Sequence, residues 1–270
     1  MKWFIKDPFN IPMVLGVISL IFAWALNAGH IQLPSPNNSY SFQAEFEAEL
    51  ERMAQEGDPA SLLFLALQEH KPRFYRAFMQ EFDTSLRQAM RRPDASQTFL
   101  EQAAYDFMKH NGYRLFDVVF DHPFKLSDSH MNRLLDWQIK RLEEIQPESS
   151  KLCVAFAHDE MRKVQNSVSV SPELQAQMFR LMREVLEAAP PATVKAANQH
   201  ELAAWVDHVA SPRYAILDVY DAETASDYDT LKACQASIHL LKRLQTEPAP
   251  ERAKLYRGVY FQDMLAHYQG

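Results

Sequence analysis

The chain has 270 residues, of which 47% are hydrophobic and 23% are charged, and it contains only 6 glycines. This length and composition allow one large or two small domains with a buried core, and they argue against a chain that is disordered throughout. The formal net charge of −7 at pH 7 argues against nucleic-acid binding, because affinity for the phosphate backbone comes mainly from clustered lysine and arginine.

The most apolar stretch of the sequence is residues 11–33, and no residue from 8 to 44 carries a formal charge. About 20 helical residues cross a hydrocarbon core about 30 Å thick, so we expect a single transmembrane helix that anchors the chain in the lipid bilayer. The alternative is a signal peptide that is cleaved near Ala25 or Ala28. In either case the rest of the chain is expected to be exported.

The flanking charges predict the orientation of this anchor. Lys2 and Lys6 precede it, whereas three glutamates between residues 45 and 49 follow it before the next cation. The positive-inside rule places the short N-terminal segment, residues 1–10, in the cytoplasm and the large domain across the membrane. We therefore expect a single-pass protein of the bacterial inner membrane with a periplasmic domain.

A polar spacer, residues 34–39, is followed by a first predicted helical subdomain, residues 40–165. Asp58 and Pro59 are typical of the start of a helix. Apolar side chains recur at helical spacing before and after them, namely Phe42, Phe46, Leu50 and Met53, then Phe74, Phe78, Phe82 and Leu86, then Phe99, Leu100, Ala103, Ala104, Phe107 and Met108. Residues 113–124 are predicted as a short helix or an extended loop, and residues 127–145 as another amphipathic helix.

Residues 166–172 have the composition of a linker and are the best candidate for a boundary within the domain. A second helical subdomain is expected over residues 173–270, with helices near 172–189, 194–209, 230–244 and 253–268 and an uncertain segment at 214–220 that could be a strand. The sequence contains neither βαβ alternation nor a glycine-rich phosphate loop. The predicted fold is all-α, a bundle or a stack of helical hairpins with about eight to ten helices after the anchor, and no cofactor is expected.

The two cysteines, Cys153 and Cys234, allow two interpretations. In an oxidising periplasm they could form a disulfide, which would stabilise the domain by up to about 4 kcal/mol in the chain-entropy model. Both cysteines lie among apolar residues, so two buried free thiols are also consistent with the sequence. Both alternatives stay open at this point.

Candidate catalytic residues are few. His158, Asp159 and Glu160 follow a buried apolar turn where desolvation could shift a pKa, and Asp121 and His122 lie in an aromatic segment. Adjacent helical residues point in different directions, so neither group converges without help from other segments. The histidine spacings fit no metal site, and the nucleophile motif of serine hydrolases is absent.

Methionines and aromatic residues on two predicted helices could line a groove for a partner helix or a lipid chain. These candidate binding residues are Met178, Phe179, Met182, Tyr260, Phe261 and Met264. The alternative is that they pack in the core, as apolar residues at helical spacing usually do.

These observations predict a membrane-anchored envelope protein whose exported helical domain binds a protein partner as a scaffold, assembly factor or tethered chaperone. We expect a binding protein rather than an enzyme, because catalytic motifs are lacking. Two alternatives remain open: an exported hydrolase with its site near His158 or His122, and a helical carrier of an apolar ligand.

Overall fold

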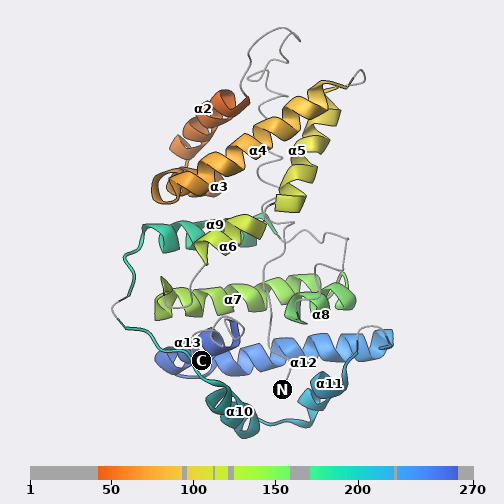
Figure 1. The fold of residues 1–270 in the computed structure, drawn as a ribbon. Coiled ribbons are helices and arrows are strands. Elements are labelled where there is room, and N and C mark those ends of the chain that lie inside the picture. Colours follow the sequence, from red (N-terminus) through yellow and green to blue (C-terminus); the bar gives the residue numbers. More distant parts are fainter. Residues whose placement is uncertain are drawn as a thin grey trace. The chain divides into compact units, whose positions relative to one another are not determined.

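The computed structural model describes residues 42–92, 96–111, 113–120, 125–158, 171–191, 193–221 and 224–260. Within these ranges it contains twelve α-helices and no strand (Figure 1), so the all-α prediction is confirmed, with more helices than the eight to ten expected. The N-terminal segment, the anchor and the spacer, residues 1–39, lie outside the described residues. None of the described helices combines the length and the apolar character that a membrane span needs.

The helices follow one another closely along the chain. They are α2 (Phe42–Gln55), α3 (Pro59–His70), α4 (Pro72–Met90), α5 (Gln97–Asn111), α6 (Tyr113–Val119), α7 (Asp128–Ile145), α8 (Ser150–His158), α9 (Pro172–Glu187), α10 (Gln199–His208), α11 (Ala215–Val219), α12 (Asp227–Gln245) and α13 (Ala249–Tyr260), with a 3-10 turn, η3 (Pro212–Tyr214), before α11. The segment that could have been a strand, 214–220, is therefore η3 and α11, and the segment 113–124 begins with the short helix α6.

The described helices form two compact units. The α2–α6 unit also includes the end of α9, Met182–Ala188, and the α7–α13 unit comprises the described parts of Phe120–Leu181 and Ala189–Gly270. The predicted linker, residues 166–172, is described only at its last two residues. The units divide near residues 119 and 120 and again within α9.

Aromatic rings form the core of the α2–α6 unit. The Phe82 ring of α4 lies 5.6 Å from the Phe46 ring of α2 and 5.3 Å from the Phe107 ring of α5, measured between centroids. Phe78 packs edge-on against Phe107 at 5.4 Å. Phe78, Phe82 and Leu86 are each at most 1% exposed. The predicted apolar stripe of this helix is thus its buried face, and the rings join three helices.

Local signals in the sequence set the first helix boundaries. Gly57 adopts φ +85°, a left-handed conformation that favours glycine, and it ends the turn after α2. The Asp58 carboxylate then accepts a hydrogen bond from the Ser61 amide at 2.7 Å, and Pro59 occupies the first turn of α3. The predicted start of this helix is confirmed.

In the α7–α13 unit, α12 packs against α7 and α8 while α13 packs against α7 (Figure 1). A close approach involves Gly258 of α13: a Cβ atom at this position would lie 2.4 Å from the backbone oxygen of Ala197. The Ala197 amide also donates a hydrogen bond to the Lys254 carbonyl at 3.0 Å. The segment before α10 therefore lies directly on the backbone of α13, and glycine is required at this contact.

Candidate functional site

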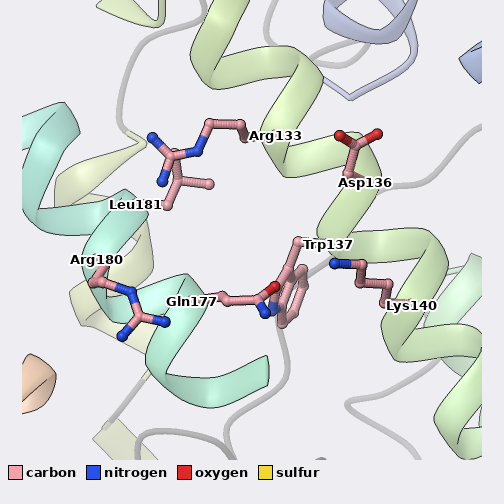
Figure 2. A pocket seen from close by; sticks show the side chains of 7 residues that line it. All are labelled: Arg133, Asp136, Trp137, Lys140, Gln177, Arg180 and Leu181. Carbon is pink, nitrogen blue, oxygen red and sulfur yellow. The ribbon is translucent and has the colours of Figure 1, made fainter. Parts of the chain in front are cut away.

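A groove between α7 and α9 is the candidate site of the α7–α13 unit. Its volume is about 240 Å³, and the residues that line it are Arg133, Asp136, Trp137, Lys140, Gln177, Arg180 and Leu181. The α7 residues are spaced at i, i+3, i+4 and i+7, and the α9 residues at i, i+3 and i+4, so that each set occupies one helix face. Figure 2 shows the side chains of the two helices lining the groove from opposite sides.

Two contacts hold α9 against α7. The Glu144 carboxylate of α7 accepts hydrogen bonds from the backbone amide and the hydroxyl of Ser171, at 2.8 Å and 2.7 Å. Further along, the Trp137 indole nitrogen donates to the Leu174 carbonyl at 2.9 Å. A carboxylate near the first turn of a helix also interacts favourably with its dipole. The start of α9 is therefore fixed on α7, and this fixes the width of the groove.

The floor of the groove is apolar. Trp137 is 3% exposed and Leu181 is 2% exposed. The guanidinium carbon of the buried Arg141 lies 5.1 Å from the centroid of the Trp137 ring, a cation–π arrangement. Burial lowers the pKa of Arg141 well below its ordinary value. Since its indole nitrogen is hydrogen-bonded and its ring contacts Arg141, the Trp137 side chain is held in one orientation.

The rim of the groove is cationic. Arg133, Lys140 and Arg180 are exposed, whereas Asp136 is the one carboxylate among the lining residues. Asp136 accepts a hydrogen bond from the Gln245 side-chain amide at 2.7 Å. Within the described part of the chain, neither Lys140 nor Arg180 makes an ion pair. The lining thus carries three positive charges and one negative charge in a chain whose net charge is −7.

A second cation of this unit, Arg257 of α13, is fully buried and structural. Its guanidinium donates to the carbonyls of Lys195 and Leu126, the latter at 2.9 Å, and to the Asp128 carboxylate at 3.0 Å. Burial lowers the pKa of Arg257, and the contact with Asp128 opposes this change. Arg257 therefore joins α13 to the start of α7 and to the segment before α10, and it takes no part in the groove.

The cysteines are joined by a disulfide between α8 and α12. Cys153 and Cys234 have an S–S distance of 2.04 Å and a Cα–Cα distance of 5.6 Å, and both residues are 0% exposed. Of the two alternatives that the sequence allows, the structure contains the disulfide. It closes a loop of 81 residues within the α7–α13 unit.

The predicted catalytic residues lie outside the described residues, apart from the backbone of His158. His158 is the last residue of α8, and its side chain is outside the described part of the chain. Asp159, Glu160, Asp121 and His122 also lie outside the described residues.

The predicted apolar binding residues are buried wherever the structure describes them. Met178 and Met182 are 0% exposed, Phe179 is 2% exposed and Tyr260 is 8% exposed, while Phe261 and Met264 lie outside the described residues. The four described side chains therefore pack in the interior and line no open apolar groove, as helical spacing of apolar residues generally implies.

The groove residues were not identified from the sequence. The stretch 133–140 does carry a signal, since Arg133, Asp136, Trp137 and Lys140 fall on one helical face beside a buried stripe. The other wall of the groove comes from α9, about 40 residues later, and no sequence pattern links the two segments. The pairing of α7 with α9 therefore depends on the tertiary contacts of Trp137 and Glu144.

The described residues contain no group of three or more histidine, cysteine or acidic side chains that could hold a metal ion. Comparison with known proteins gives no match to a family model, to a curated protein or to a solved structure.

Proposed function

We propose that the chain is a single-pass protein of the bacterial inner membrane whose periplasmic helical domain binds a protein partner, as a scaffold, assembly factor or tethered chaperone. The observation that carries the proposal furthest is the buried disulfide between α8 and α12. Disulfides persist in oxidising compartments such as the periplasm and are rare in the cytosol. The disulfide thus supports export of the domain.

The sequence supports the membrane tether. The uncharged run 8–44 is long enough for one transmembrane helix, and the cations before it and the glutamates after it favour a cytoplasmic N-terminus. The domain would then be held close to the outer face of the inner membrane. This position suits a protein that assembles with other envelope proteins or assists their folding.

The groove between α7 and α9 supports partner binding. A hydrogen bond holds the Trp137 side chain at its floor, and its rim carries exposed cations. A polar, solvent-accessible rim is typical of protein interfaces. The hydrolase alternative depends on His158 and His122, whose side chains lie outside the described residues. The carrier alternative depends on an apolar cavity, whereas the lining of this groove is mostly polar.

Affinity capture of the full-length protein from detergent-extracted membranes tests the proposal. A portion of the sample is alkylated under denaturing conditions, without reduction, and the bait and its partners are identified by mass spectrometry. We expect an intact N-terminus, unmodified Cys153 and Cys234, and a partner in stoichiometric amount. A bait that is cut near Ala25 or Ala28 and arrives alone would overturn the tether, and alkylation of both cysteines would overturn export to an oxidising compartment.

A further inference from the structure

We propose that the groove between α7 and α9 is the docking site for an acidic peptide segment of the partner, one that presents two or more carboxylates. This inference rests on the proposed function and adds to it the chemistry of the partner and the place where it binds. The observations that carry it are the charge of the rim, the spacing of its cations and the fixed floor.

The spacing of the cations favours a peptide over a single small anion. Arg133 and Lys140 are seven residues apart on α7, so their Cα atoms are about 10 Å apart along the helix axis. Arg180 lies across the groove on α9 (Figure 2). Two or more carboxylates on one peptide match this spread of cations, because residues along an extended chain are about 3.3 Å apart.

The charge of the whole chain favours a short acidic segment over a long polyanion. The net charge of −7 repels nucleic acid or an extensive anionic surface, whereas a short peptide responds mainly to charges within about 8–10 Å at physiological salt. The lining itself carries three cations and one carboxylate, and the nearby Glu144 carboxylate is engaged by two hydrogen bonds from Ser171. The lining therefore favours a short acidic segment, while the net charge of the chain disfavours larger polyanions.

The remaining lining residues suit a peptide backbone. Gln177 lines the groove together with Trp137 (Figure 2), and a side-chain amide can both donate to and accept from a peptide group. The Trp137 side chain is 3% exposed, and Leu174 and Arg141 already hold it in place at the floor. Little side-chain freedom is then lost at the floor when a peptide binds, which favours affinity.

Binding of a fluorescein-labelled acidic peptide, alternating Glu and Gly over eight residues, tests the inference. It is measured by fluorescence polarisation with the full-length protein in neutral detergent. The double variant Lys140→Gln with Arg180→Gln is expected to raise the Kd about tenfold. This corresponds to about threefold for each of two ion pairs lost at an exposed rim. The matched control, Lys151→Gln with Arg213→Gln, removes two exposed charges from the same unit outside the groove, and is expected to leave the Kd within twofold of the parent value.

Equal losses in the two double variants would overturn the inference, because binding would then follow total charge. Absence of peptide binding would overturn it as well. The same proteins are mixed with neutral vesicles and with vesicles that contain phosphatidylglycerol. If the groove variant loses vesicle binding and keeps peptide binding, the groove recognises lipid headgroups and the peptide proposal is wrong.

Photo-crosslinking in cells separates failure of this inference from failure of the proposed function. A benzophenone amino acid is placed at Gln177 in the groove or at Gln235, an exposed position on α12. Crosslinks from position 177 that the acidic peptide competes away support the inference. A partner that crosslinks only from position 235 overturns the inference and leaves the proposed function standing. Failure to capture any partner from either position, or by affinity, overturns both.

Discussion

Replacement of Cys153 and Cys234 by alanine is expected to lower the free energy of unfolding of the α7–α13 unit by about 4.5 kcal/mol. The disulfide closes a loop of 81 residues. In the chain-entropy model a loop of this length removes about 15 cal/mol/K from the unfolded chain, which corresponds to about 4.5 kcal/mol at 298 K. Both cysteines are 0% exposed, so loss of the sulfur atoms adds a smaller packing cost. The expected loss is a large fraction of the 5–15 kcal/mol typical of folded domains.

Urea unfolding of the full-length protein in neutral detergent, followed by tryptophan fluorescence, measures this loss. Trp137 and Trp205 both lie in the α7–α13 unit and are buried or nearly so, at 3% and 9% exposure. The parent protein is compared with and without a phosphine reductant. Reduction is expected to move its midpoint toward that of the double variant, while the double variant itself should not respond to the reductant.

A stability difference below about 1 kcal/mol between the parent and the double variant would refute the chain-entropy reasoning. A midpoint of the double variant that falls on reduction would show that the reductant acts elsewhere than on this disulfide. Alkylation of both thiols in the denatured, unreduced protein would refute the cross-link itself.

Three further substitutions probe other contacts of the fold. Gly258→Ala is expected to destabilise the α7–α13 unit by about 1–3 kcal/mol in spite of a better helix propensity, because its Cβ would lie 2.4 Å from the Ala197 backbone oxygen; an unchanged or higher urea midpoint would contradict this. Phe82→Ala should cost the α2–α6 unit about 3–5 kcal/mol in a circular-dichroism unfolding curve, and Phe82→Leu clearly less, because Phe82 is 1% exposed and contacts two other rings. Tyr256→Phe should leave stability at pH 7 unchanged or raise it by up to about 1 kcal/mol, because the buried Tyr256 hydroxyl finds no hydrogen-bond partner among the described residues. Burial raises the pKa of Tyr256 in the folded state. The contribution of this ionisation to folding stability is fully present below the unfolded-state pKa of about 10. It is lost as the pH rises above that value, because the unfolded chain then loses the proton while the folded chain keeps it. Urea midpoints between pH 8 and 11 should therefore fall less steeply in Tyr256→Phe than in the parent, and an equal or steeper fall would contradict the assignment.

Features set by local sequence were the easiest to predict. The Asp58 cap and Pro59 begin α3 as expected, and the Phe78, Phe82 and Leu86 stripe is the buried face of α4. In each case the residues that determine the structure are within a few positions of one another. The pattern of caps and helical periodicity then contains enough information.

Features that depend on distant segments were missed or left undecided. The predicted helix 194–209 begins only at Gln199, because Asn198 and Glu201 form a capping box and Ala197 is held by the Lys254 carbonyl. The disulfide stayed undecided because apolar neighbours suit a free thiol and a cystine equally well. Helical spacing of apolar residues alone does not distinguish a partner groove from a core, so Met178 and its neighbours were candidates for both.

The hydrogen bonds from Arg257 to Leu126 and Asp128 have a consequence for the order in which the chain folds as it leaves the ribosome. Contacts among α2, α3, α4, α5 and α6 join neighbouring segments, so these helices can pack soon after they are synthesised. The start of α7, in contrast, is held by a guanidinium that lies 129 residues later than Asp128. The α7–α13 unit cannot close its core until α13 has been made, and until then its apolar faces are open to chaperones.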